Sequence, residues 1–183
     1  MSFRILLFTA ASAAAIASSA HAQSTPPADA ANLEEVVVTG TRTAGRTRLD
    51  TIAPVDVVNE KALTRTGTTE LAQSLSTLAP SINFPRPAIT DGTDHIRPAT
   101  LRGLSPDQTL VLVNGTRRHA TALVNVNGSI GRGSAAVDLN AIPTIALNRV
   151  EVLRDGASAQ YGSDAIAGVI NLRLREARSG GGA

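Results

Sequence analysis

Short hydrophobic runs, separated by polar and glycine-containing stretches, dominate the second half of the chain. In "NRVEVLRD", residues 148–155, apolar and polar residues alternate, so Val150 and Val152 share one face of a predicted strand. Apolar runs bounded by glycine, proline or asparagine are also typical of strands. Four such runs predict further strands, at 54–59, 99–104, 110–113 and 167–176.

One segment has helical spacing instead. In "TTELAQSLSTLAPSI", residues 68–82, leucines at i, i+4 and i+7 share one face: Leu71, Leu75 and Leu78. Glu70 lies in the first predicted turn, where the helix dipole favours a negative charge. Pro80 ends the helix, because the residue before a proline disfavours the helical region. A short helical turn is predicted at 138–147.

The remaining segments are loops and turns. Residues 83–98 contain three prolines and an Asp-Gly, and residues 125–137 contain three glycines. Long loops of this kind are often functional. Asn114-Gly115 follows an apolar run and predicts a hairpin, because both residues tolerate positive φ. Strands and helices do not alternate regularly, so the predicted class is α+β, with a small mixed β-sheet of about four short strands, short helices and long loops.

The N-terminal region has the pattern of an exported protein. Residues 1–22 combine Arg4, an apolar run and a small-x-small sequence, which predicts a signal peptide cleaved after Ala22. Residues 23–33 are small, polar and proline-containing, and we interpret them as a flexible leader. The last residues, 176–183, have the composition of a linker.

The segment "EEVVVTGTR", residues 34–42, has a strong β preference because of its three consecutive valines. It lies next to the leader, with no other predicted strand nearby. Two interpretations remain open. It is either an edge strand of the domain or a peptide that adds itself to the sheet of another protein.

Composition excludes several classes of function. The formal net charge is only +2 and the basic residues form no run. After residue 22 the aromatic residues are Phe84 and Tyr161 alone, so a nucleic-acid surface is not expected. The chain contains no cysteine, which excludes thiolate metal sites and cysteine nucleophiles.

Catalytic patterns are weak. Asp91, Asp94 and His95 lie in one proline-rich loop without the spacing of metal ligands. Ser158 lacks the G-x-S-x-G context of a nucleophile elbow, and "NGSIGRGS" lacks the Lys-Ser/Thr end of a phosphate loop. We therefore expect no enzymatic activity, no metal site and no cofactor.

Three motifs occur in a characteristic order behind the predicted signal peptide: "EEVVVTG", "LRGLSPDQTLVLVNGTRRH" and "NRVEVLRDGASAQYGSDAIAGVINL". Together they resemble the plug domain of TonB-dependent outer-membrane receptors. The resemblance extends from residue 34 to about residue 175. It divides the chain into a TonB box at 34–40, a plug domain at 41–175 and a tail at 176–183 that leads toward a barrel.

The resemblance implies a mechanism. In this family the plug fills an outer-membrane β-barrel of 22 strands, and TonB, energised by an inner-membrane complex, binds the TonB box as an added strand. Force then rearranges the plug so that a nutrient such as a siderophore can pass. The box corresponds to five residues here: Glu35, Val36, Val37, Val38 and Thr39. We expect the ligand to meet the apical loops, within 83–98 and 119–134.

The family also assigns roles to motif residues. Arg102 and Arg154 match arginines that reach acidic residues on the barrel wall. The usual Arg-Gly-Pro step is Arg154-Asp155-Gly156 here, so Asp155 could pair with Arg154 and weaken that link. Further motif positions are expected to shape turns, close packing and the loop between the last two strands: Gly103, Asn114, Gly115, Gly156, Tyr161, Gly162, Gly168 and Asn171.

The chain offers few residues after its last predicted strand, whereas each barrel strand needs about ten. We therefore favour the N-terminal portion of a receptor. The alternative is a free periplasmic module that binds TonB or ligand without transport. A periplasmic enzyme is the third possibility, and it would require turnover that depends on Asp94 or Ser158.

Overall fold

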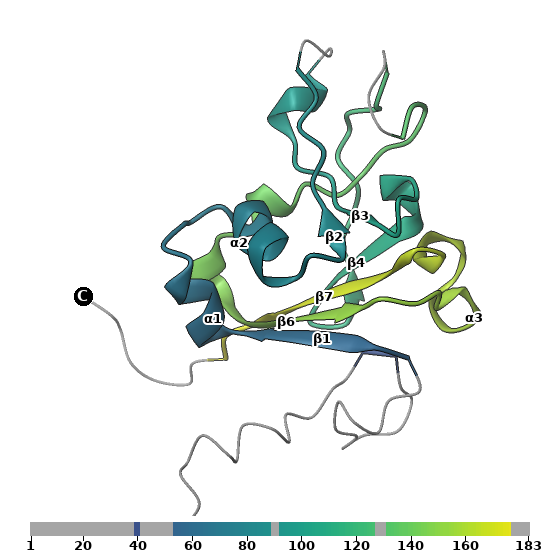
Figure 1. Ribbon diagram of the computed structural model, residues 1–183. Helices are drawn as coiled ribbons and strands as arrows, with labels where there is room; N and C mark the ends of the chain where they lie inside the picture. Colours follow the sequence, from purple (N-terminus) through teal and green to yellow (C-terminus); the bar gives the residue numbers. More distant parts are fainter. Residues whose placement is uncertain (1–38, 41–52, 89–91, 127–130, 177–183) are drawn as a thin grey trace, which may run out of the picture. The chain divides into compact units, whose positions relative to one another are not determined.

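The computed structural model describes residues 39–40, 53–88, 92–126 and 131–176. All of them belong to one unit of the chain, Glu34–Ala183. A five-stranded sheet with the order β1-β6-β7-β4-β5 forms its centre, and β2 and β3 form a separate two-stranded sheet (Figure 1). The strands are β1 (Val55–Asn59), β2 (Ile82–Asn83), β3 (Thr100–Leu101), β4 (Thr109–Val113), β5 (Thr116–Arg117), β6 (Leu147–Leu153) and β7 (Gly168–Leu174).

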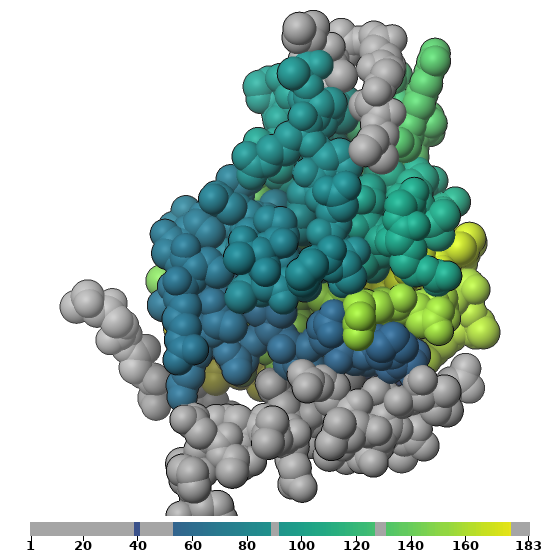
Figure 2. Space-filling view, viewed as in Figure 1, coloured from purple at the N-terminus to yellow at the C-terminus, as the bar shows by residue number. Residues whose placement is uncertain are grey.

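Among the described residues, three α-helices accompany the sheets: α1 (Glu60–Arg65), α2 (Leu71–Leu78) and α3 (Ser158–Tyr161). Helices α1 and α2 lie on the same face of the five-stranded sheet, and α3 lies in the connection between β6 and β7 (Figure 1). The stretches around β2 and β3 continue away from the sheet on the helical side, so their loops form the end of the described surface furthest from β1 (Figure 2). Within the described residues, no helix has the length and apolar character to cross a membrane.

Strand β7 is the centre of the mixed sheet. It pairs antiparallel with β6 and parallel with β4, while β1 pairs antiparallel with the outer side of β6. In the β6–β7 register Val152 is opposite Ile170, and Glu151 is opposite Asn171. Because successive residues of a strand point to opposite faces, Glu151 and Asn171 share the face that does not carry the helices.

Both faces of β6 and β7 are buried. The helical face packs Val150, Val152, Ile170 and Leu172 against the apolar sides of α1 and α2, with Leu63, Leu71 and Leu75. The opposite face, which we call the back face, carries a smaller apolar cluster of Val55, Leu110, Leu112, Leu153, Ala165 and Val169. Strands buried on both faces tolerate a polar side chain only where its hydrogen bonds are made within the protein.

The α+β class predicted from the sequence is confirmed, and so is its mixed sheet. The hairpin also forms where it was predicted. Asn114 (φ +50°) and Gly115 (φ +82°) both adopt positive φ between β4 and β5, as a tight two-residue turn requires. The predicted helical turn at 138–147 is present as two short 3-10 turns, Leu139–Ala141 and Thr144–Ala146.

Two details differ from the prediction. Within the described residues the main sheet has five strands and the small sheet has two, whereas the sequence predicted a sheet of about four strands and did not locate β2 and β5, which have two residues each. Helix α1 was not predicted, because it has six residues and buries only Leu63, which leaves no periodic pattern to detect. Its signal lies instead in its N-cap, where the Asn59 side chain accepts a hydrogen bond from the Ala62 amide at 2.9 Å.

Gly168, at the start of β7, generates the first prediction. Its φ is +149°, and a Cβ at this position would lie 2.3 Å from the Leu153 carbonyl oxygen and 2.9 Å from Leu101 Cδ1. Gly168→Ala therefore combines backbone strain with overpacking, and we expect it to lower the free energy of unfolding by at least about 3 kcal/mol in urea titrations.

The matched control is Gly67→Ala. Gly67 also has positive φ (+67°), but no atom lies within 4 Å of its added Cβ, so only backbone strain of about 1 kcal/mol is expected. Equal losses of stability in the two variants would contradict the close approach of β7 to β6.

Candidate functional site

The back face of the sheet carries a fully buried carboxylate, Glu151, whose residue is 0% exposed. Its Oε2 accepts two hydrogen bonds from Thr39, one from the amide at 3.0 Å and one from the hydroxyl. Its Oε1 accepts a hydrogen bond from Arg149 Nε at 2.8 Å. The carboxylate is thus held by donors from its own strand and from a residue 112 positions earlier in the chain.

Asn171, opposite Glu151 on β7, connects this cluster to the β4–β5 turn. Its Nδ2 donates to Thr39 Oγ1 at 3.0 Å, and its Oδ1 accepts from the Gly115 amide at 3.1 Å. The Asn114 side chain in the same turn accepts from the Leu174 amide at 2.9 Å. Three of the predicted motif residues, Asn114, Gly115 and Asn171, therefore lie in one hydrogen-bonded group around β7.

Tyr161 lies in the connection between β6 and β7. Its ring packs against the back-face apolar cluster, and its hydroxyl accepts a hydrogen bond from the Gly40 amide at 3.1 Å. The Tyr161 carbonyl oxygen and the Asp164 carboxylate both accept from the guanidinium group of Arg117 on β5. Gly162 follows with φ +90°, and Gly156 lies close enough to Ile166 that an added Cβ would be 3.2 Å from its carbonyl oxygen.

The predicted TonB box lies mostly outside the described residues, which include Thr39 and Gly40 but not 35–38. Thr39 is 1% exposed and belongs to the hydrogen-bonded group that it forms with Glu151 and Asn171. Gly40 has φ +81°, and an added Cβ would lie 3.2 Å from the Leu153 side chain. The end of the valine-rich segment is therefore closely packed on β6.

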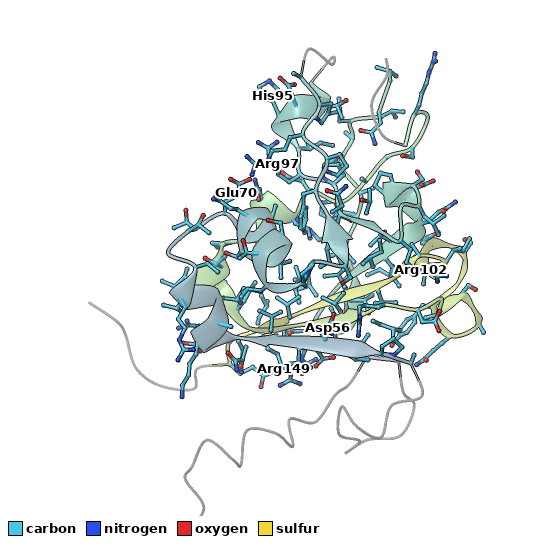
Figure 3. The ribbon with its side chains drawn as sticks, in the orientation of Figure 1. Asp56, Glu70, His95, Arg97, Arg102 and Arg149 are labelled. Carbon is cyan, nitrogen blue, oxygen red and sulfur yellow. The ribbon has the colours of Figure 1, made fainter. Side chains whose placement is uncertain are left out.

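Arg102 occupies a strained turn after β3. The turn is closed by the Leu104 amide, which donates to the Leu101 carbonyl at 3.0 Å, and both central residues have positive φ, Arg102 at +57° and Gly103 at +73°. Positive φ is uncommon for an arginine. The turn directs its half-exposed side chain to the Asp155 carboxylate, 3.4 Å away. Figure 3 shows Arg102 at the same end of the sheet as the β6–β7 connection.

Arg154 pairs with Asp56 on β1 at 3.0 Å, and both side chains are partly exposed. The sequence suggested Asp155 as its intramolecular partner. Among the described residues Asp155 instead pairs with Arg102, because consecutive residues at the end of a strand point to opposite sides. The two motif arginines thus form separate ion pairs on the domain surface.

Glu70 holds the apical segments together. It is the N-cap residue of α2, one position before the helix begins rather than within its first turn as predicted, and its side chain makes no capping hydrogen bond. Its Oε1 instead accepts from Arg86 at 2.8 Å, from Arg97 at 3.1 Å and from Asn140 at 3.0 Å. Figure 3 shows Glu70 and Arg97 next to each other on the helical side, with His95 further from the sheet.

These contacts lower the pKa of Glu70. The hydrogen bond from Asn140 has the largest effect on the pKa. Burial opposes it, and the charges of Arg86 and Arg97 and the hydrogen bond from Arg97 add to it. The net pKa is below the ordinary value of 4.5. Glu70 is therefore ionised at neutral pH and ties the loop 83–98 to α2.

The candidate metal ligands of the loop 83–98 were Asp91, Asp94 and His95. Asp94 Oδ1 lies 3.8 Å from His95 Nε2, and the His95 side chain is 83% exposed. The third candidate, Asp91, lies outside the described residues. Within the described part of the chain, no group of three or more His, Cys, Asp or Glu side chains is placed to hold a metal ion.

Comparisons with known proteins decide the family. Residues 47–169, more than half of the chain, match the family model described as the TonB-dependent receptor plug domain. The chain belongs to this plug family. The plug is also similar to the vitamin B12 transporter BtuB of Vibrio cholerae serotype O1, with 32% identity over 146 residues that cover 80% of this chain and 21% of the transporter. It therefore spans about a fifth, 21%, of the length of these curated relatives.

Solved receptors have the same fold in part of their chains. The ferric enterobactin receptor PfeA, in complex with BCV-L6, is 28% identical, with a TM-score of 0.53 over 67% of the plug and 18% of the receptor. A variant of PfeA from Pseudomonas aeruginosa, in complex with enterobactin, is 27% identical, with a TM-score of 0.52 and the same coverage of both chains. These relatives are named as a transporter and as receptors, not as enzymes.

Sequence reasoning missed Glu151 and Arg149, which organise the back face. It placed Glu70 in a helical turn but missed its contacts with the loop 83–98. The alternation in β6 was interpreted as one buried and one polar face, but the polar position between Val150 and Val152 is fully buried. A carboxylate flanked by two valines in a predicted central strand was the available signal, because such a group needs donors from elsewhere in the fold.

Glu70 generates a prediction of pH dependence. Its folded-state pKa is lowered, so its contribution to stability is present above the unfolded value of 4.5 and is lost as pH falls through the folded value. We expect the stability advantage of the wild type over Glu70→Gln to shrink as pH falls from about 6 to about 3, measured by urea unfolding. The matched control is Glu176→Gln, which removes the carboxylate of an exposed residue. If the stability differences of the two variants from the wild type changed with pH in the same way, the stabilising role of the Glu70 contacts would be contradicted.

The ion pairs generate a third prediction. Arg154 and Asp56 have side chains that are 42% and 36% exposed, so Arg154→Gln should cost less than about 1 kcal/mol in the free energy of unfolding. Arg149 is 18% exposed and pairs with the buried Glu151, so Arg149→Gln should cost at least about 2 kcal/mol, because it leaves a buried carboxylate with one donor fewer. A larger loss of stability for Arg154→Gln than for Arg149→Gln would contradict the view that the buried ion pair stabilises the domain more than the exposed one.

Proposed function

We propose that this plug is the N-terminal, lumen-filling part of a TonB-dependent outer-membrane receptor that takes up a nutrient at the expense of the proton gradient. The family match carries the proposal. The plug corresponds to 21% of the curated transporter and 18% of the solved receptors, which supports a 22-stranded barrel as the partner that surrounds it.

In this proposal residues 1–22 direct export, 23–33 form a leader, 34–40 contain the TonB box, 41–175 form the plug domain and 176–183 lead to the barrel. The protein resides in the outer membrane when joined to its barrel. As a free module it would reside in the periplasm, and no observation of the fold favours that alternative.

The two motif arginines are the proposed contacts with the barrel wall. Arg102 and Arg154 are about half exposed, and each pairs with a carboxylate that is also partly exposed. Exposed ion pairs are worth little to the isolated domain, so both guanidinium groups can exchange their partners for carboxylates of a surrounding wall. The strained φ of Arg102 supports this role, because backbone strain of this kind concentrates at functional sites.

The proposed ligand is a small nutrient of the siderophore class, which meets the apical loops 83–98 and 119–134. Support comes from the names of the relatives, a vitamin B12 transporter and a ferric enterobactin receptor. The Glu70 cluster supports the site as well, because it holds one of these loops to α2 through Arg86 and Arg97.

TonB is the proposed energising partner, and it binds Glu35–Thr39 as an added strand. The test is a titration of the exported chain with the periplasmic domain of TonB, in comparison with Val37→Pro. Proline removes a main-chain donor and fixes φ, so we expect the proline variant to bind at least about tenfold more weakly.

The matched control is Ala31→Pro, which adds a proline within the predicted leader and should leave the affinity unchanged. Thermal unfolding of all three proteins establishes that each is folded. Saturable binding that only Val37→Pro abolishes supports the box. Absence of binding by the folded wild type would exclude the free-module alternative, and equal binding by both proline variants would contradict the assignment of the box.

A further inference from the structure

The turn Thr39–Gly40 is attached to the back face by four hydrogen bonds. Thr39 donates twice to Glu151 Oε2, through its amide and through its hydroxyl. Asn171 donates to the Thr39 hydroxyl oxygen at 3.0 Å, and the Gly40 amide donates to the Tyr161 hydroxyl at 3.1 Å. The Thr39 hydroxyl therefore donates one hydrogen bond and accepts another at the same time, as a hydroxyl group can.

The chemistry of this attachment makes it strong and specific. Hydrogen bonds to a carboxylate are charge-assisted and stronger than those between neutral groups. Thr39, Glu151 and Asn171 are all at most 1% exposed, so partial opening would leave buried polar atoms without partners, which is unfavourable. The attachment should therefore open in one step, when water replaces Thr39.

The sheet itself survives this opening. Oε1 of Glu151 is bound by Arg149 Nε from the same strand, at 2.8 Å, so the carboxylate keeps its cationic partner after Thr39 leaves. Asn171 keeps its hydrogen bond from the Gly115 amide. Opening thus removes one set of donors and leaves the pairing of β6 with β7 in place.

The position of the attachment decides where a pulling force acts. Thr39 and Gly40 contact β6, β7 and the connection between them, which are central elements of the sheet. The next described strand along the chain is β1, at the edge. A force applied to residues before Thr39 therefore acts first on the central strands and reaches β1 only after the attachment has opened.

We propose that Thr39 and Gly40 form a mechanical latch, which we call the Thr39 latch, that must open before a force on the preceding segment can reach β1. The proposal deepens the proposed function, since it assigns a force threshold to the segment that TonB would pull. Once the latch opens, the chain between Gly40 and Val55 can extend to at most about 50 Å. The force then acts on the edge strand β1, which can separate from β6 one residue pair at a time.

Single-molecule pulling tests the latch without TonB. The chain contains no cysteine, so Val37→Cys and Ala183→Cys in the full chain provide unique attachment points. At constant force we expect the wild type to show a first step of up to about 50 Å that precedes any unfolding of the sheet. Thr39→Val and Glu151→Gln should shorten the lifetime before this step at least about tenfold.

Thr39→Ser is the matched control, because it keeps the hydroxyl group, and its lifetime should stay close to that of the wild type. Hydrogen exchange gives a second measurement that does not require force: the Thr39 amide should be protected in the wild type and should exchange at least about tenfold faster in Glu151→Gln, with the β6–β7 amides unchanged. If Glu151→Gln does not fold, Thr39→Val alone decides the test.

Equal lifetimes in Thr39→Val and the wild type, or a first step in which the sheet unfolds, would overturn the latch. The outcome is independent of TonB, because the handles apply the force. A latch that responds as expected in a chain that does not bind TonB would support the latch and contradict the proposed partner. Binding of TonB by a chain that shows no latch step would support the proposed partner and contradict the latch.

Discussion

A carboxylate buried in the middle of a β-sheet is unfavourable unless several donors surround it, and this constraint organises the plug around Glu151. The residue is 0% exposed and lies on β6, opposite Asn171 of β7. Arg149 supplies the positive charge, Thr39 supplies two hydrogen bonds, and Asn171 orients the Thr39 hydroxyl. The back face thus depends on a residue far away in the sequence, which fixes the N-terminal segment on the central strands.

At each end of the plug, a glutamate side chain holds a neighbouring segment through hydrogen bonds. At the back face Glu151 holds the segment that we propose to be pulled, and at the apical end Glu70 holds one of the two loops that we propose to meet the ligand. Between them lies the apolar core that α1 and α2 form with β6 and β7. Each attachment consists of a few directional hydrogen bonds rather than a large apolar contact, so each can open while the core stays packed. This separation suits the rearrangement under force that we propose for the plug.

Much of the fold could be predicted from local patterns, because the β4–β5 turn, the strands β6 and β7 and the leucine stripe of α2 depend on residues close in sequence. The family could be inferred from the motif order, and the model match confirms it. The polar clusters could not be predicted, since Glu151 and Thr39 are 112 positions apart and the local sequence around either residue does not indicate its partner. The same applies to Arg154, whose carboxylate partner is Asp56 on a neighbouring strand rather than the adjacent Asp155.

The central claim, that Glu151 and Thr39 act as one unit, is tested most directly by a double-mutant cycle. Thr39→Val, Glu151→Gln and the double variant are unfolded in urea, and the free energies of unfolding are compared with the wild type. We expect a coupling energy of at least about 1 kcal/mol, because Thr39→Val removes the hydroxyl donor and Glu151→Gln removes the negative charge that strengthens the same hydrogen bond. Changes that add to within about 0.3 kcal/mol would contradict the account, since they would mean that the two residues stabilise the plug independently.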